Sequence, residues 1–146
     1  MRQTIQSWYA WLQKAVSTEK EELKPVYSDG RQLWAMDGYR LHARQVALKK
    51  KGTVTVNEEG LFTVEENGTL PDFTAVLPCS DAKASIVVER DTLLKALAGQ
   101  DKHVRLTLFT ADISVELSSA GAYALVMPIC GLDEDEFWRP EVEEKQ

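Results

Sequence analysis

The chain has 146 residues, of which 44% are hydrophobic and 27% charged, and its formal net charge is −6. This composition is typical of a globular domain and excludes an extensively disordered chain. No apolar run reaches the roughly 18 to 20 residues that a membrane-spanning helix needs, and residues 1–4 contain no apolar signal-peptide block. We therefore expect a cytoplasmic protein.

Acidic residues are concentrated at the end of the chain. Residues 131–146 contain seven acidic and two basic side chains, whereas residues 1–130 contain 16 acidic and 15 basic ones. We expect one folded domain over residues 1–130, followed by an acidic C-terminal tail over residues 131–146. Such tails are usually solvated, but Phe137 and Trp138 stand beside the acids, so packing of this aromatic pair onto the body is the alternative.

The first half of the chain changes from a helical to a strand-like pattern. Ile5, Trp8 and Leu12 recur at three- and four-residue spacing and predict a helix over residues 4–17, with Thr4 as its N-cap. After Pro25 the apolar spacing becomes two, and Asp-Gly pairs separate the alternating segments, as is typical of hairpin turns. The predicted strands are 26–28, 31–35, 39–47, 52–56 and 61–64.

The second half repeats this pattern in shorter form. Residues 65–83 carry the turn signals Asn67-Gly68, Pro71-Asp72 and Pro78 and predict a loop. A buried strand over 85–88 and a helix over 92–98 should follow, with Asp91 as the helix cap and Gly99 at its end. The remaining predicted strands are 104–109, 113–117 and 123–127. The repeat of a helix followed by strands indicates duplication of one structural unit.

The order of these pieces resembles the bacterial DNA polymerase sliding clamp, the DNA polymerase III beta subunit family. The resemblance rests on the turn Asp37-Gly38-Tyr39-Arg40-Leu41, the helix with its three alternating strands, and the final Val126-Met127-Pro128. It covers roughly residues 4–130 and implies an α+β, DNA-clamp-like domain. In such a domain two helix-plus-antiparallel-strands units pack with both helices on one side of the sheets. Clamp subunits contain three such domains, whereas this chain has room for one.

The resemblance also implies a hydrophobic groove that receives short linear peptides from replication or repair proteins. Met36 and Tyr39 stand where the family usually has threonine and histidine. Alternatively, the apolar residues are ordinary core and Arg40 only stabilises a turn. The implied groove residues are Met36, Gly38, Tyr39, Arg40, Leu41, Pro71, Val76, Val126, Met127 and Pro128.

Clamps attract duplex DNA through basic residues on their inward helices. This chain offers Lys14, Lys20, Lys95 and Lys102 as weak DNA-facing candidates. Because non-specific binding needs several basic residues on one surface, we expect weak or no binding of double-stranded DNA. A ring of clamp domains could form here only through self-association, so a homo-oligomer is a further expectation.

No catalytic or metal-binding motif is present. The chain lacks a G-x-S-x-G elbow, a Walker loop and an H-E-x-x-H pair, and Cys79 and Cys130 lack C-x-x-C spacing. We expect no metal, no cofactor and no enzymatic activity. The predicted function is a clamp-like binding or assembly module associated with DNA replication or repair. The alternatives are a monomeric or dimeric structural or regulatory protein that keeps the clamp fold without encircling DNA, and a small enzyme whose site lies in the 65–83 loop.

Overall fold

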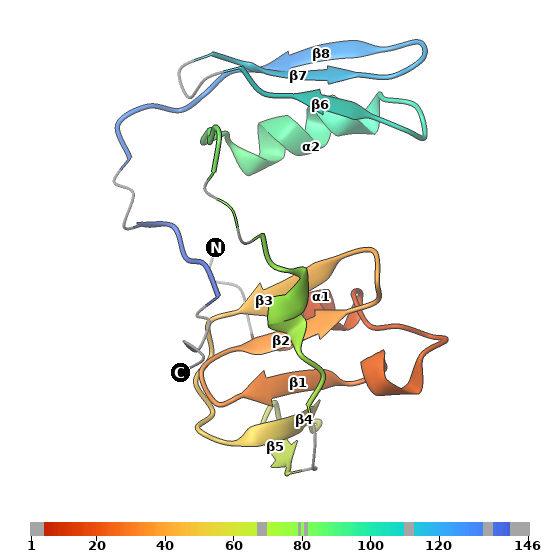
Figure 1. Ribbon diagram of the computed structural model, residues 1–146, viewed down its shortest axis with the longest axis vertical. Helices are drawn as coiled ribbons and strands as arrows, with labels where there is room; N and C mark the ends of the chain where they lie inside the picture. The colour runs from red at the N-terminus through yellow and green to blue at the C-terminus, as the bar shows by residue number, and fades with distance from the viewer. Residues whose placement is uncertain are drawn as a thin grey trace. The chain divides into compact units, whose positions relative to one another are not determined.

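The computed structural model divides the chain into two compact units, shown in Figure 1. Unit 1 comprises Met1–Pro78 and Trp138–Gln146, and unit 2 comprises Cys79–Phe137. The predicted N-cap Thr4 and most of the predicted acidic tail lie outside the described residues. The structure describes residues 5–66, 70–78, 80, 82–109, 113–132 and 136–140.

Unit 1 begins with helix α1, Ile5–Gln13, which is shorter than the predicted helix over 4–17. The chain tightens at its end, where the Ala15 amide donates to the Leu12 carbonyl over 3.0 Å. The Ser17 hydroxyl then accepts from the amides of Glu19 and Lys20 at 3.2 and 3.0 Å. Such side-chain hydrogen bonds compete with helix continuation, which explains the early end of α1.

The strands of unit 1 form one antiparallel sheet in the order β3-β2-β1-β4-β5. Hairpin turns occur at both predicted Asp-Gly pairs, and the first is held by Asp29, whose Oδ1 accepts from the amides of Arg31 and Gln32 at 2.9 and 3.0 Å. A short 3-10 helix, η1, Glu21–Leu23, precedes the sheet. The strands are β1 Val26–Asp29, β2 Leu33–Met36, β3 Leu41–Arg44, β4 Lys51–Val56 and β5 Phe62–Glu65.

The sheet of unit 1 is covered on both faces. On one face, Trp8 and Leu12 of α1 and Ala15, just after the helix, form a cluster with Leu33 and Ala35 and their neighbours. On the other, the 3-10 helix η2, Phe73–Val76, covers a second cluster of Tyr27, Trp34 and Phe73. Alternate residues of β2 therefore face opposite layers, as the two-residue period of a strand requires.

Unit 2 contains helix α2, Arg90–Ala98, and a separate antiparallel sheet in the order β6-β7-β8. Its core is small: Val115, Leu117 and Val126 are buried, and Leu93 and Ala96 of α2 pack against them. Neither described helix is long and apolar enough to cross a membrane. The strands are β6 Arg105–Thr107, β7 Val115–Ser118 and β8 Tyr123–Val126.

The architecture is thus mixed α+β with two helices and antiparallel sheets, but two local predictions in unit 2 are wrong. Residues 85–88 form no strand, although the Val87 carbonyl accepts from the Ile129 amide at 2.8 Å. One such bond does not make a ladder. Helix α2 begins at Arg90, so its N-cap is Glu89, while the predicted cap Asp91 lies in the first turn. Gly99 ends the helix as predicted.

Candidate functional site

A cavity of about 200 Å³ lies beside the turn between β2 and β3. Six residues of the predicted groove line it, five from the hairpin and one from η2. The structure therefore brings together two segments that are far apart in the sequence. The lining residues are Met36, Gly38, Tyr39, Arg40, Leu41 and Val76.

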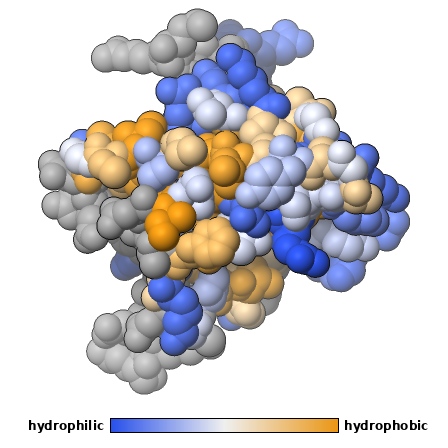
Figure 2. All heavy atoms as spheres, turned by 90° about the horizontal axis from the view of Figure 1, so that it is seen from above, coloured by the Kyte–Doolittle hydropathy of each residue, from blue (hydrophilic) through white to orange (hydrophobic). Residues whose placement is uncertain are grey.

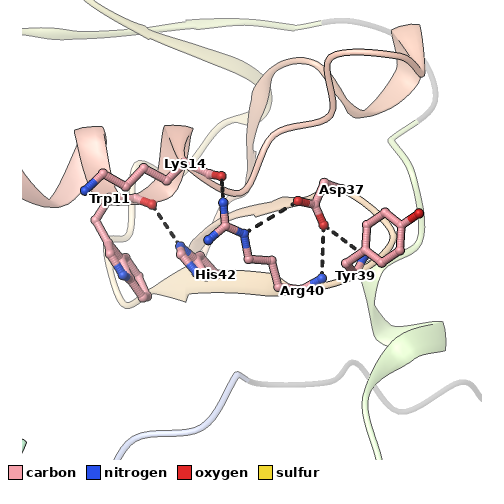
Figure 3. A network of polar contacts seen from close by, with 6 residues as sticks. All are labelled: Trp11, Lys14, Asp37, Tyr39, Arg40 and His42. Atoms are coloured by element: carbon pink, nitrogen blue, oxygen red, sulfur yellow. Dashed lines mark hydrogen bonds and ion pairs between the residues drawn. The ribbon is translucent and has the colours of Figure 1, made fainter. Parts of the chain in front are cut away.

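Asp37 fixes the turn that forms one wall of this cavity (Figure 3). Its Oδ1 accepts from the amides of Tyr39 and Arg40 at 2.9 and 3.0 Å, and its own amide donates to the Arg40 carbonyl at 3.3 Å. Gly38 has a φ of +95°, a conformation that L side chains rarely adopt. These contacts shorten β3 at its start, because the amides of residues 39 and 40 bond to the aspartate.

The Arg40 guanidinium is held by the protein itself. Its Nε lies 3.5 Å from Asp37 Oδ2, and another of its nitrogens donates to the Lys14 carbonyl, just beyond α1 (Figure 3). The alternative interpretation gave Arg40 this turn-stabilising role, and the same residue also lines the cavity. We therefore treat Arg40 as a residue that positions the wall.

His42 forms a second link between β3 and α1. Its Nδ1 lies 2.8 Å from the Trp11 carbonyl, and its ring stacks on the Trp11 ring with a centroid distance of 4.0 Å (Figure 3). Because a carbonyl oxygen can only accept, Nδ1 carries the hydrogen. His42 thus bonds to a carbonyl in the last turn of α1, where helix carbonyls lack a partner within the helix, and Arg40 bonds to the carbonyl of Lys14 just after it. The hairpin and the helix end are therefore joined at two points.

The floor of the cavity is packed, whereas its rim is exposed. Met36 and Leu41 are half-buried and pack against the second cluster of unit 1. Val76 is 59% exposed and Tyr39 98% exposed. Val76 is therefore not an ordinary core residue, and an incoming side chain would cover it.

Two residues that support the floor were absent from the predicted groove. Trp34 lies between Tyr27 and Phe73, with ring centroids 4.9 and 4.8 Å away. Trp34 and Met36 are two positions apart on β2 and so share a face of the sheet. This spacing was a usable signal for Trp34, whereas the four residues of η2 are too few for a periodic pattern to single out Phe73. The Trp34 Nε1 is buried and has no hydrogen-bond partner in the described part of the chain.

The remaining predicted groove residues do not line this cavity. Pro71 is half-buried just before η2. Val126 is 1% exposed in the core of unit 2, whereas Met127 is 65% exposed and Pro128 half-buried in the same unit. The cavity of unit 1 is therefore formed without them. All four predicted DNA-facing lysines are exposed, Lys14 and Lys20 in unit 1 and Lys95 and Lys102 in unit 2.

Unit 2 has a more open depression of about 550 Å³ lined by residues 103–105 and 118–120. The Ser119 hydroxyl in it already donates to Gln100 Oε1 at 2.8 Å and accepts from the Asp101 amide at 3.1 Å. Unit 2 also exposes large apolar side chains, among them Tyr123 and Met127, and one face of the molecule shows apolar patches between hydrophilic ones (Figure 2). The described residues contain no group of three or more potential metal ligands.

Comparisons with known proteins found no matching family model, no matching curated protein and no matching solved structure.

The contacts of Asp37 predict how the turn responds to acid. The amides of Tyr39 and Arg40 and the Arg40 guanidinium hold the pKa of Asp37 below its usual range. A carboxylate with a lowered folded-state pKa stabilises the fold above its unfolded pKa of about 3.9, and this contribution is lost as the pH falls through the folded value. We expect the NMR amide shifts of Tyr39 and Arg40 to titrate with a midpoint below about 3.9.

Asp37→Asn is the control for this titration. The amide oxygen of asparagine can still accept from the two backbone amides but does not ionise in this range. The variant should therefore keep the turn and lose the titration. A midpoint at or above the ordinary aspartate value, or an unchanged titration in the variant, would contradict the assignment.

Proposed function

We propose that the chain is a non-enzymatic binding module that captures a short linear peptide in the cavity beside the β2–β3 turn. The observation that carries the proposal is that six residues of the predicted groove line one cavity, although Val76 is distant from the others in the sequence. The packed floor keeps the cavity open before binding, and the exposed rim offers apolar surface to a ligand. A pre-formed site reduces the ordering cost of binding.

The size of the cavity favours a side chain over a cofactor. Its volume of about 200 Å³ is below the roughly 300 to 1,000 Å³ of typical small-molecule sites. Burial of one aliphatic or aromatic anchor contributes about 1.5 to 3 kcal/mol. Met36 adds an adaptable wall, because methionine changes shape easily. With the cost of ordering a peptide, we expect micromolar affinity.

The resemblance to sliding clamps extends the proposal to the cellular role. Both units combine a helix with antiparallel strands, as the repeated unit of a clamp domain does. On this basis we propose a clamp-like fold, an association with DNA replication or repair, and self-association as one mode of assembly. Weak or absent duplex DNA binding belongs to the same proposal, because residues 1–130 are nearly neutral.

The test is the binding of a heptapeptide with a Leu-Phe anchor, measured by calorimetry on the full chain. Val76→Glu should weaken binding about tenfold or more, because it places an unpaired charge at an apolar site. Leu61→Glu is the matched control, since Leu61 is 60% exposed in unit 1 and does not line the cavity. Val76 is itself exposed, so the variant should fold. Equal affinities for the two variants, or no binding by the native chain, would refute the proposal.

A further substitution separates the clamp-like groove from a cavity of unit 1 alone. In sliding clamps the Val-Met-Pro segment contributes to the groove, so a clamp-like site predicts that Met127→Glu also weakens binding. Met127 is 65% exposed, and the change should leave the core of unit 2 intact. Unchanged affinity would limit the peptide site to the six residues of unit 1.

A further inference from the structure

Strand β3 lies at the margin of the sheet of unit 1 (Figure 1). It pairs with β2 on one side, through the register Met36↔Leu41, Ala35↔His42 and Trp34↔Ala43. Its other side is an edge. Backbone groups on an edge can pair with another extended chain.

The register of β2 and β3 shows which groups point to that edge. The Asp37 amide donates to the Arg40 carbonyl, so these two residues form a hydrogen-bonded pair. Pairs alternate along an antiparallel ladder, so Ala35 and His42 form the next such pair. The amide and carbonyl groups of Leu41 and Ala43 must then point away from β2. No hydrogen bond joins these groups to another described residue.

The edge is continuous with the cavity through Leu41. This residue lines the cavity with the turn and Val76, and its backbone is the first outward-facing group of β3. A chain paired with Leu41 would place the side chain opposite it on the same face of the sheet. That face carries Met36, Leu41 and the η2 layer. A residue paired with Leu41 can therefore pair its backbone with β3 and direct its side chain toward the cavity.

We propose that the partner is an extended peptide that adds to β3 as an antiparallel strand, with an apolar anchor in the cavity. This inference rests on the proposed function and specifies how the peptide is bound. The anchor pairs with Leu41, and the residue two positions before it pairs with Ala43. The residue between them lies opposite His42 and directs its own backbone groups to solvent. Leu41 and Ala43 together offer two donors and two acceptors to the ligand.

A second copy of the chain fits this edge less well than a peptide. In the antiparallel register that uses both outward residues, Leu41 of each copy pairs with Ala43 of the other. Arg40 then lies directly opposite Arg44. Like charges at facing positions destabilise a strand pair. A peptide without basic residues at these positions avoids that repulsion.

The first experiment is an N-methyl scan of the Leu-Phe heptapeptide against the full chain, with calorimetry as the readout. Methylation removes one backbone donor and adds bulk where a hydrogen bond would form. We expect two positions, separated by one residue, to lose affinity by about tenfold or more, since an unpaired carbonyl remains at the edge. Methylation of the residue between them should leave affinity unchanged. Uniform tolerance, or uniform loss, would overturn the added strand.

The second experiment follows amide hydrogen exchange of the protein by NMR. Peptide binding should slow exchange at Leu41 and Ala43, while the His42 amide, already bonded to β2, should change little. If the peptide binds without this alternation, the cavity remains the proposed binding site but the added strand is overturned. Absence of binding by the unmodified peptide would instead refute the proposed function. Concentration-dependent protection of Leu41 and Ala43 without peptide would identify a second copy as the occupant and also overturn the proposal.

Discussion

Replacing Trp34 with alanine is expected to destabilise unit 1 by about 3 to 5 kcal/mol, the usual cost of truncating a buried aromatic side chain. Trp34 is 1% exposed and packs between the rings of Tyr27 and Phe73. Its removal opens a void under η2, whose Phe73 then loses its main aromatic neighbour. Since domains are stable by only about 5 to 15 kcal/mol, a large part of unit 1 stability depends on this ring.

Trp34→Phe separates the ring from its polar atom. Phenylalanine keeps an aromatic side chain between Tyr27 and Phe73 and removes the Nε1 donor, which has no partner in the described part of the chain. The smaller side chain lowers the free energy of unfolding, whereas removal of an unpaired buried donor raises it. Because the two effects oppose each other, we expect the free energy of unfolding to change by less than about 1.5 kcal/mol. Because the core clusters of unit 1 are distinct from that of unit 2, the stability of unit 1 is best measured by amide exchange in β1 and β2. A similar cost for both variants would contradict this account.

Gly52→Ala should also cost about 3 kcal/mol, because over-packing at a rigid contact is at the upper end of such effects. Gly52 is buried in β4 with a φ of +155°, and a Cβ at this position would lie 2.0 Å from the Glu65 carbonyl oxygen and 2.7 Å from the Glu65 carbonyl carbon. Both atoms belong to the backbone, so no side-chain rotation relieves the overlap. Strand β5 must move, and its pairing with β4 weakens.

Two other glycines provide controls for this substitution. Gly38 has a φ of +95°, and a Cβ there would meet no atom within 4 Å, so Gly38→Ala tests backbone strain alone, worth about 1 to 2 kcal/mol. Gly99 has an ordinary φ of −94° and open space, so Gly99→Ala should be nearly neutral. Amide exchange of the β4 and β5 residues measures the first two effects. If Gly52→Ala destabilises unit 1 no more than Gly38→Ala does, the steric explanation is refuted.

Local turn chemistry made much of unit 1 predictable from the sequence. The Asp-Gly pairs at residues 29–30 and 37–38 mark real turns, because aspartate bonds to the amides that follow and glycine adopts a positive φ. The prediction of a strand over residues 85–88 was wrong for a different reason. An apolar run indicates burial, but a strand also needs a paired ladder, which depends on segments that local patterns do not identify.

The candidate site was partly predictable for the same reasons. The turn residues of the cavity could be found from their motif, and Val76 from the groove residues that the clamp resemblance implies. The contact of Arg40 with the Lys14 carbonyl could not be found, because it joins residues 26 positions apart through a backbone atom. The packing of Phe73 on Trp34 was not predicted either, because a four-residue helix is too short for its pattern to indicate which side chain it packs against.

The Arg40 contact also means that the β2–β3 hairpin alone could not form the cavity in another protein. The hairpin could be transplanted to another scaffold with its Asp37 turn intact, since those hydrogen bonds are local. The guanidinium would then lack the Lys14 carbonyl, and the wall supplied by Val76 would be missing. A graft that transfers ligand recognition therefore has to carry the end of α1 and η2 together with the hairpin, which amounts to most of unit 1.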